Sequence, residues 1–147
     1  MKITICGSIA FYDQILAVKE KLEALGHEVE FPHFDIRDEV GNPITVKEFY
    51  DLRLKETDPN SWLWNRKAEA INAHFEKVDW SDAIITLNYD KRDKANYIGA
   101  NTLMEMGLAF WLRKKIFLLN PIPEISYKEE ILGMKPIVIN GDLTKIV

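Results

Sequence analysis

Cysteine and long apolar runs are nearly absent from this sequence. The single cysteine, Cys6, cannot form an internal disulfide, and the first residues lead directly into a short apolar run rather than a signal peptide. The apolar run at residues 83–87 is far shorter than the roughly 18 residues that a membrane-spanning helix needs. We therefore expect a cytoplasmic protein with no membrane partner.

An excess of positive charge is also missing. The net charge of −4 provides no basic field of the kind that holds a duplex phosphate backbone. The histidines His27, His33 and His74 are scattered with no cysteine pair near them, and no Gly-x-Gly-x-x-Gly or phosphate-loop Gly-Lys-Ser/Thr motif occurs. The sequence thus indicates no nucleic acid polymer, no metal and no cofactor.

What the chain does contain is enough apolar sequence for one core, with 47% hydrophobic residues in a length of 147. We expect one domain, residues 1–147, in which short apolar runs alternate with segments of helical spacing. Residues 35–60 are charged and irregular around one helix, and we interpret them as an insertion above the sheet. The predicted strands are 2–6, 27–31, 82–88, 115–119 and 137–139, and the predicted helices are 12–25, 46–55, 60–78, 102–112 and 127–132.

This alternation predicts an α/β doubly wound fold, Rossmann- or flavodoxin-like, with a five-stranded parallel sheet in the order 2-1-3-4-5 and helices on both faces. Ligands of such sheets bind where the strand order reverses, at the carboxyl ends of the first and third strands. That rule brings Gly7-Ser8-Ile9 to the same crevice as Gly99-Ala100-Asn101-Thr102. Small residues that lead into a helix offer free N–H groups to a phosphate or a sugar hydroxyl, although a glycine after a strand is more often only a turn.

Glu105 has two readings that the spacing alone leaves open. With Thr102 it forms the pattern of a capping box, in which each side chain satisfies a free backbone N–H of the other residue. Alternatively, the helix dipole keeps the Glu105 carboxylate ionised at the crevice, as a nucleophile or an electrostatic partner for an oxocarbenium-like carbon.

Three segments together resemble the nucleoside 2-deoxyribosyltransferase superfamily, which includes the nucleotide N-glycosidases. They are Gly7-Ser8-Ile9, the strand start Ser81-Asp82-Ala83-Ile84, and residues 99–109 with Glu-Met-Gly-Leu-Ala. The resemblance implies cleavage or transfer of the N-glycosidic bond of a (deoxy)nucleoside or nucleoside 5′-monophosphate, with Glu105 as the nucleophile. It also implies a homodimer or higher homo-oligomer and substrate-binding roles for Gly7, Ser8, Ile9, His33, Gly99, Asn101 and Thr102.

The sequence departs from that family at one position and leaves rival functions open. His74 stands where the family has an aspartate that helps the base to leave, and packing is the favoured interpretation of this histidine over acid catalysis. Lys91, Arg92 and Lys94 form either a solvated charge run or a contact for a 5′-phosphate. The rivals are a cytokinin-activating type of nucleotide phosphoribohydrolase, whose paired glycines are missing, and a catalytically silent nucleotide-binding module.

Overall fold

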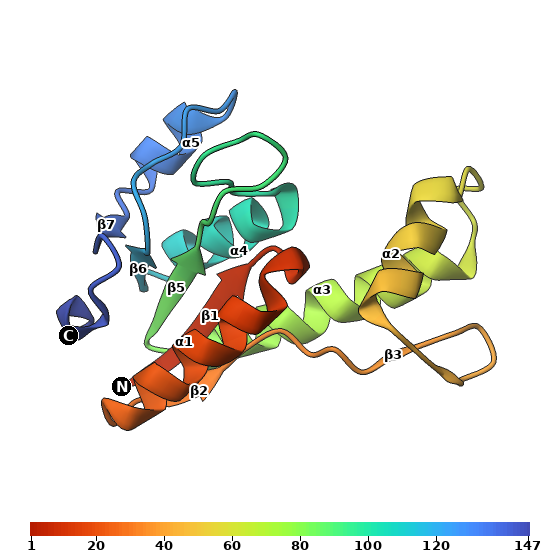
Figure 1. The fold of residues 1–147 in the computed structure, drawn as a ribbon, viewed down its shortest axis with the longest axis horizontal. Helices are drawn as coiled ribbons and strands as arrows, with labels where there is room; N and C mark the ends of the chain where they lie inside the picture. The colour runs from red at the N-terminus through yellow and green to blue at the C-terminus, as the bar shows by residue number, and fades with distance from the viewer.

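The computed structural model describes all residues, 1–147, and its centre is a parallel sheet of five strands (Figure 1). The strands lie in the order β2-β1-β5-β6-β7 and every neighbouring pair is parallel. Counted along the chain within this sheet, the order is 2-1-3-4-5, so the predicted topology is confirmed. The strands are β1 (Lys2–Gly7), β2 (Glu28–Glu30), β5 (Ala83–Leu87), β6 (Lys115–Leu118) and β7 (Ile137–Val138).

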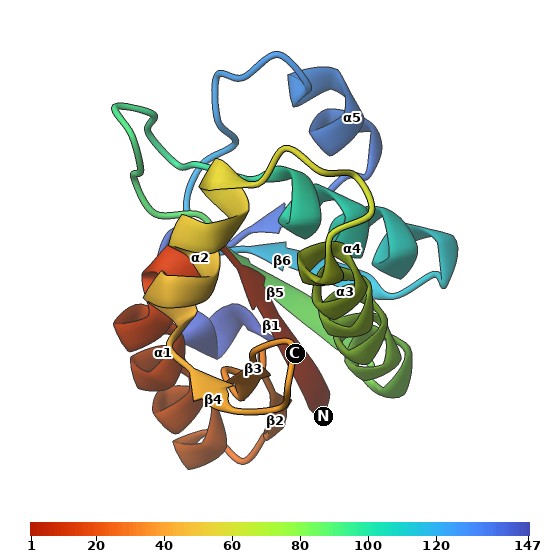
Figure 2. The ribbon, with the colours of Figure 1, turned by 90° about the vertical axis from the view of Figure 1, so that its right-hand side faces the viewer.

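The sheet has an apolar core on each face because successive strand residues point to opposite sides. Ile3 and Ile5 of β1 pack with one set of buried residues, whereas Cys6 packs with the other. The first core contains α1 (Tyr12–Ala24) and the chain end around η2 (Leu143–Lys145). The second contains α3 (Trp62–Trp80), α4 (Ala100–Trp111) and α5 (Lys128–Gly133), and Figure 2 shows α1 on one side of the sheet and α3 and α4 on the other.

The insertion between β2 and α3 projects to one side of the sheet (Figure 1). It holds a short antiparallel hairpin, β3 (Ile36–Arg37) with β4 (Pro43–Ile44), followed by α2 (Val46–Lys55). The bounds of α2 match the predicted helix, and a capping box between Thr45 and Glu48 fixes its start. The hairpin was not predicted, because strands of two residues show no period-2 pattern.

The start of α4 differs from the prediction. The helix begins at Ala100 with Gly99 as its N-cap, two residues before the predicted start at Thr102, and no side chain caps it. Thr102 therefore lies inside the first turn, and the capping-box reading of Thr102 and Glu105 is wrong. No helix in the structure is both long and apolar enough to cross a membrane.

Candidate active site

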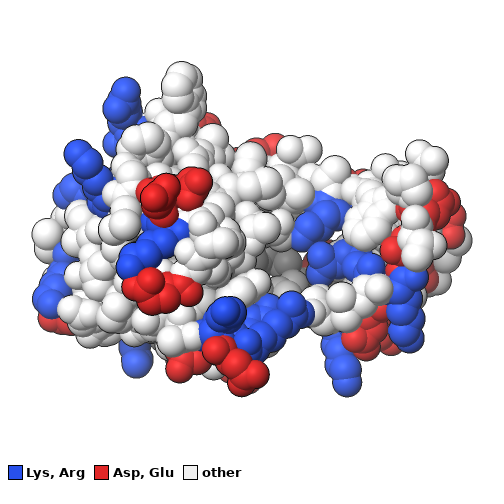
Figure 3. All heavy atoms as spheres, turned by 90° about the horizontal axis from the view of Figure 1, so that it is seen from above, with Lys and Arg blue, Asp and Glu red and all other residues white.

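A cavity of about 620 Å³ opens at the carboxyl ends of β1 and β5. Residues of α3, the first half of α4 and the insertion line it, and Figure 3 shows a hollow between two lobes with Lys and Arg atoms at its border. The structure brings every residue of the predicted site to this cavity, while their roles in binding stay predictions. These residues are Gly7, Ser8, Ile9, His33, Gly99, Asn101, Thr102 and Glu105.

Both predicted glycines lie close to neighbouring atoms. A Cβ on Gly7 would lie 3.1 Å from the carbonyl oxygen of Leu87 on the neighbouring strand, and a Cβ on Gly99 would lie 3.2 Å from the Tyr97 hydroxyl. Ser8 is the N-cap of η1 (Ile9–Phe11), since its Oγ accepts a hydrogen bond from Ala10 N at 3.3 Å. The glycines thus let the chain pass close to its neighbours at the cavity edge.

The amino end of α4 also faces the cavity. Ala100, Asn101 and Thr102 form the first turn of this helix and line the cavity wall, and no side chain caps the helix. The first N–H groups of a helix have no partner within the helix and carry the positive end of its dipole. This turn can therefore donate hydrogen bonds to an anionic or hydroxyl group of a ligand.

Three potentially reactive side chains from three elements meet behind this turn. His74 of α3 places Nε2 3.5 Å from Cys6 Sγ of β1 and 3.7 Å from Glu105 Oε2 of α4. The His74 and Glu105 side chains are only 8% and 13% exposed, and Cys6 is fully buried. His74 and Glu105 line the cavity, and the burial of His74 agrees with the packing interpretation of this histidine.

Burial sets the protonation states of this cluster. It raises the pKa of Glu105 to about 8, and contacts with Cys6 and the charge of Lys67 offset only part of that effect. Burial lowers the pKa of His74 to about 4, helped by the charges of Lys77 and His33, and it raises the pKa of Cys6 well above its usual value. The expectation that the helix dipole keeps Glu105 ionised is therefore wrong. Glu105 lies in the second turn of α4, and desolvation outweighs the dipole there.

Comparison with known proteins supports the fold. No family model matches the sequence, and no curated protein matches it significantly. A solved 2-deoxyribosyltransferase from Bacillus psychrosaccharolyticus superposes with a TM-score of 0.50 at 19% identity, covering 85% of this chain and 76% of that one. A CMP N-glycosidase of Clostridium botulinum gives a TM-score of 0.47 at 16% identity, covering 94% of this chain and 85% of that one.

The chain has a deoxyribosyltransferase-like fold.

Positive side chains dominate the lining of the cavity in this deoxyribosyltransferase-like fold. The lining includes six Lys or Arg residues and three Asp or Glu residues, although the chain as a whole carries a net charge of −4. Lys91 donates a hydrogen bond to Ser8 Oγ at 2.8 Å, which joins the loop after β5 to the loop after β1. The cavity is therefore suited to a ligand with negative charge.

Two of these cations, Arg53 of α2 and Lys67 of α3, have no partner in the structure. Neither makes an ion pair or a hydrogen bond, and the buried Nε of Arg53 is unsatisfied. The Arg53 guanidinium lies 4.8 Å from the centroid of the Phe49 ring, and burial lowers the pKa of both cations. Sequence analysis missed them because they come from the insertion and the helix after it, where no motif marks a ligand contact.

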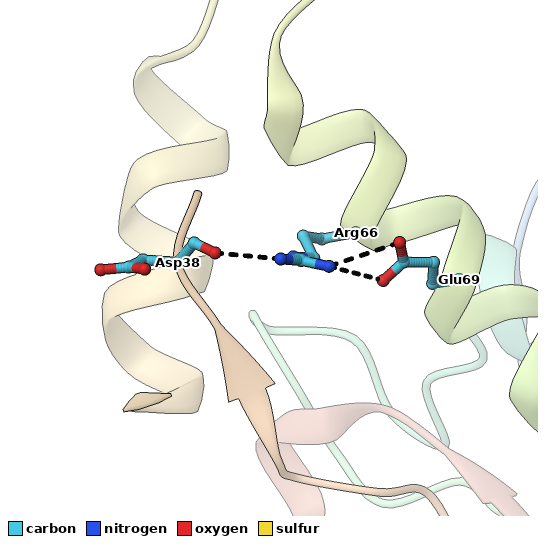
Figure 4. Close-up of polar contacts among 3 residues, drawn as sticks. All are labelled: Asp38, Arg66 and Glu69. Atoms are coloured by element: carbon cyan, nitrogen blue, oxygen red, sulfur yellow. Dashed lines mark hydrogen bonds and ion pairs between the residues drawn. The ribbon is translucent and has the colours of Figure 1, made fainter. Parts of the chain in front are cut away.

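Arg66 provides a contrast on the same wall. Its guanidinium donates to Glu69 Oε2 at 3.0 Å and to the backbone oxygen of Asp38 at 3.2 Å (Figure 4). Arg66 thus links Asp38, which follows β3, to the first half of α3. These bonds hold the Arg66 side chain within the cavity wall, whereas the Arg53 and Lys67 side chains are free to contact a ligand.

Proposed function

We propose that this protein cleaves or transfers the N-glycosidic bond of a (deoxy)nucleoside or nucleoside 5′-monophosphate, with Glu105 as the nucleophile. The observation that carries the proposal is the position of the Glu105 carboxyl group. It lies at a cavity at the carboxyl edge of the sheet, and its Oε2 atom is buried without a hydrogen bond. The fold likeness to a 2-deoxyribosyltransferase supports the same chemistry.

The proposed reaction has two displacements. First, ionised Glu105 forms a bond to the anomeric carbon while the bond from that carbon to the base nitrogen breaks, and the base leaves with the electron pair and takes up a proton from water. Water or a second base then attacks the same carbon, loses a proton and releases the Glu105 carboxylate. The first case is hydrolysis and the second is transfer.

His74 and the α4 turn have supporting roles in this proposal. His74 Nε2 lies 3.7 Å from Glu105 Oε2, which is beyond hydrogen-bond distance, so His74 packs beside the carboxyl group and restricts its movement. The first N–H groups of α4, at Ala100 to Thr102, and the hydroxyl of Ser8 hold the sugar or its phosphate. No step requires a cofactor.

The unpaired cations lead us to favour a phosphorylated substrate. Arg53 and Lys91 have no acidic partner inside the cavity, and Lys67 has only the buried Glu105 carboxyl group, so a nucleoside 5′-monophosphate would provide a partner for these cations. We further propose that residues 1–147 act as one domain within a homodimer or higher homo-oligomer. Trp111 and Phe110 at the end of α4, 79% and 46% exposed, offer an apolar surface for such an assembly.

One experiment tests the activity and separates it from its rivals. The purified protein is incubated with matched nucleosides and 5′-monophosphates, ribo and deoxy, and free base and sugar products are separated by chromatography. Base release that is accompanied by transfer of the sugar to an added second base, or by a covalent adduct on Glu105, supports the proposal, and base with ribose 5-phosphate from ribonucleotides without either indicates a phosphoribohydrolase. Binding of nucleotides without base release identifies a silent binding module, which the buried and largely protonated Glu105 would also allow.

A further inference from the structure

The cluster behind the α4 turn combines three donor types that bind metal ions. The Cys6 sulfur, a His74 ring nitrogen and a Glu105 carboxylate oxygen all lie within 4.8 Å of one another. Zinc binds cysteine sulfur at about 2.3 Å and histidine nitrogen and carboxylate oxygen at about 2.0 Å, so in a tetrahedral site the sulfur lies roughly 3.5 Å from each of the other two donors, which lie roughly 3.3 Å from each other. The separation of 3.5 Å from sulfur to nitrogen matches this geometry, and the 3.7 Å from nitrogen to oxygen is longer by a few tenths of an ångström.

The surroundings of the cluster also fit an ion. Glu105 Oε2 is buried and accepts no hydrogen bond, so it is an acceptor that a metal would satisfy. His74 and Glu105 line the cavity, which leaves an entry path and room for a water or ligand in a fourth position. A thiolate, a carboxylate and a neutral imidazole together balance the charge of a divalent cation.

We propose that Cys6, His74 and Glu105 form a site for a thiophilic divalent cation of the zinc type. Sulfur and nitrogen donors select such ions over magnesium or calcium, which prefer oxygen ligands. The positive charge of Lys67 acts on the same carboxyl group and repels a cation, so we expect reversible binding. The sequence indicated no metal, because the three donors are far apart in the chain and share no spacing motif.

Metal binding has a consequence that rests on the proposed function. A carboxylate that donates its electron pair to zinc cannot also attack an anomeric carbon, so the zinc-bound protein is inactive. Zinc occupancy and glycosyl transfer therefore exclude each other, and zinc is an inhibitor whose effect a chelator reverses.

The test is a cobalt titration of the full chain after chelator treatment, without nucleotide. We expect binding of one Co²⁺ with a thiolate-to-cobalt charge-transfer band in the near ultraviolet and visible bands of tetrahedral cobalt, all displaced by Zn²⁺. Cys6→Ser should lose the charge-transfer band. Glu105→Gln should keep that band but bind at least about tenfold more weakly, since loss of even an outer partner of a metal ligand costs 10- to 100-fold.

A matched control is His27→Ala, which removes a histidine outside the cavity and should leave the titration unchanged. Absence of the charge-transfer band, or an unchanged band in Cys6→Ser, overturns the metal site. Glu105→Gln keeps the size of the side chain, so it provides the decisive comparison if Cys6→Ser fails to fold. A cobalt spectrum without base release would refute only the proposed function, and base release that zinc does not inhibit would refute the metal site.

Discussion

The two walls of the cavity differ in burial and in charge. The sheet wall, made by the end of β1, the first half of α4 and the second half of α3, holds His74 and Glu105, with the fully buried Cys6 next to His74. The insertion wall, made by residues 35–55 and the first half of α3, holds the partly exposed cations Arg53 and Lys67, which form no ion pair. In the function we propose, the reaction belongs to the core and the recognition of substrate charge to the insertion.

The strongest way to break this comparison is to change the nucleophile on the sheet wall. Glu105→Gln keeps the size of the side chain and removes the charge, so kcat/KM should fall on the order of 10³-fold or more. The thermal unfolding temperature should stay the same or rise, because a neutral amide replaces a carboxyl group whose ionisation is unfavourable.

The control for that loss is Glu20→Gln, which changes an exposed glutamate on α1. It should leave base release unchanged. Activity of Glu105→Gln within a few-fold of the unmodified protein would remove Glu105 from the mechanism.

The pH dependence of activity sharpens the same contrast. Because Glu105 must ionise and its pKa is about 8, kcat/KM should fall about tenfold for each pH unit below that value. A chelator in the assay prevents inhibition by trace metal. A flat profile between pH 6 and 8 would show that the buried carboxyl group does not control the rate.

Stability should depend on pH in the opposite direction. Between pH 4.5 and about 8 the unfolded chain has lost the Glu105 proton while the folded chain keeps it, so the free energy of unfolding falls as pH rises. The lowered pKa of His74 acts against this only below its ordinary value of 6.5. Chemical denaturation should therefore show a decline from about pH 6.5 to 8, and Glu105→Gln should remove it.

Changes on the insertion wall should affect phosphate binding more than chemistry. Lys67→Gln should raise KM for a nucleoside 5′-monophosphate by about tenfold or more but not KM for the free nucleoside, while loss of its charge near Glu105 lowers kcat equally for both substrates. The control Lys21→Gln changes an exposed lysine on α1. Equal changes in KM for the two substrates would show that Lys67 does not read the phosphate.

The smallest effect concerns the rigidity of the sheet wall. Gly7→Ala should destabilise the protein by about 1–3 kcal/mol, because its Cβ meets the Leu87 backbone at 3.1 Å. A Cβ added at Gly107 in α4 has no atom within 4 Å, so Gly107→Ala should stabilise the protein by roughly 0.5–1 kcal/mol. Denaturant melts of both variants measure the difference, and equal values would contradict the packing role of Gly7.

The contrast between the walls also explains what could be predicted from the sequence. The sheet order and the meeting of Ser8 with the Gly99 loop follow from β-α alternation and the switch-point rule, because parallel connections allow few topologies. The start of α4 was missed because Gly99 caps it without a side chain, whereas the sequence offered Thr102 and Glu105 as a plausible box.

The protonation states and the insertion could not be predicted in the same way. The pKa of Glu105 depends on how deeply α4 packs beside α3, and the approach of His74 to Cys6 joins residues 68 positions apart. The positions of Arg53 and Lys67 depend on how α2 folds back over α3, and no local spacing encodes that arrangement.

The central claim, that Glu105 forms a covalent bond to the sugar, is tested most directly by trapping the intermediate. A 2′-fluoro-arabino nucleoside or its 5′-monophosphate slows the second displacement, and the protein is quenched in acid during turnover for intact and peptide mass spectrometry. The account predicts one glycosyl group per chain, attached to the peptide that contains Glu105 and absent from Glu105→Gln. Base release with no adduct, or an adduct on another residue, would contradict it.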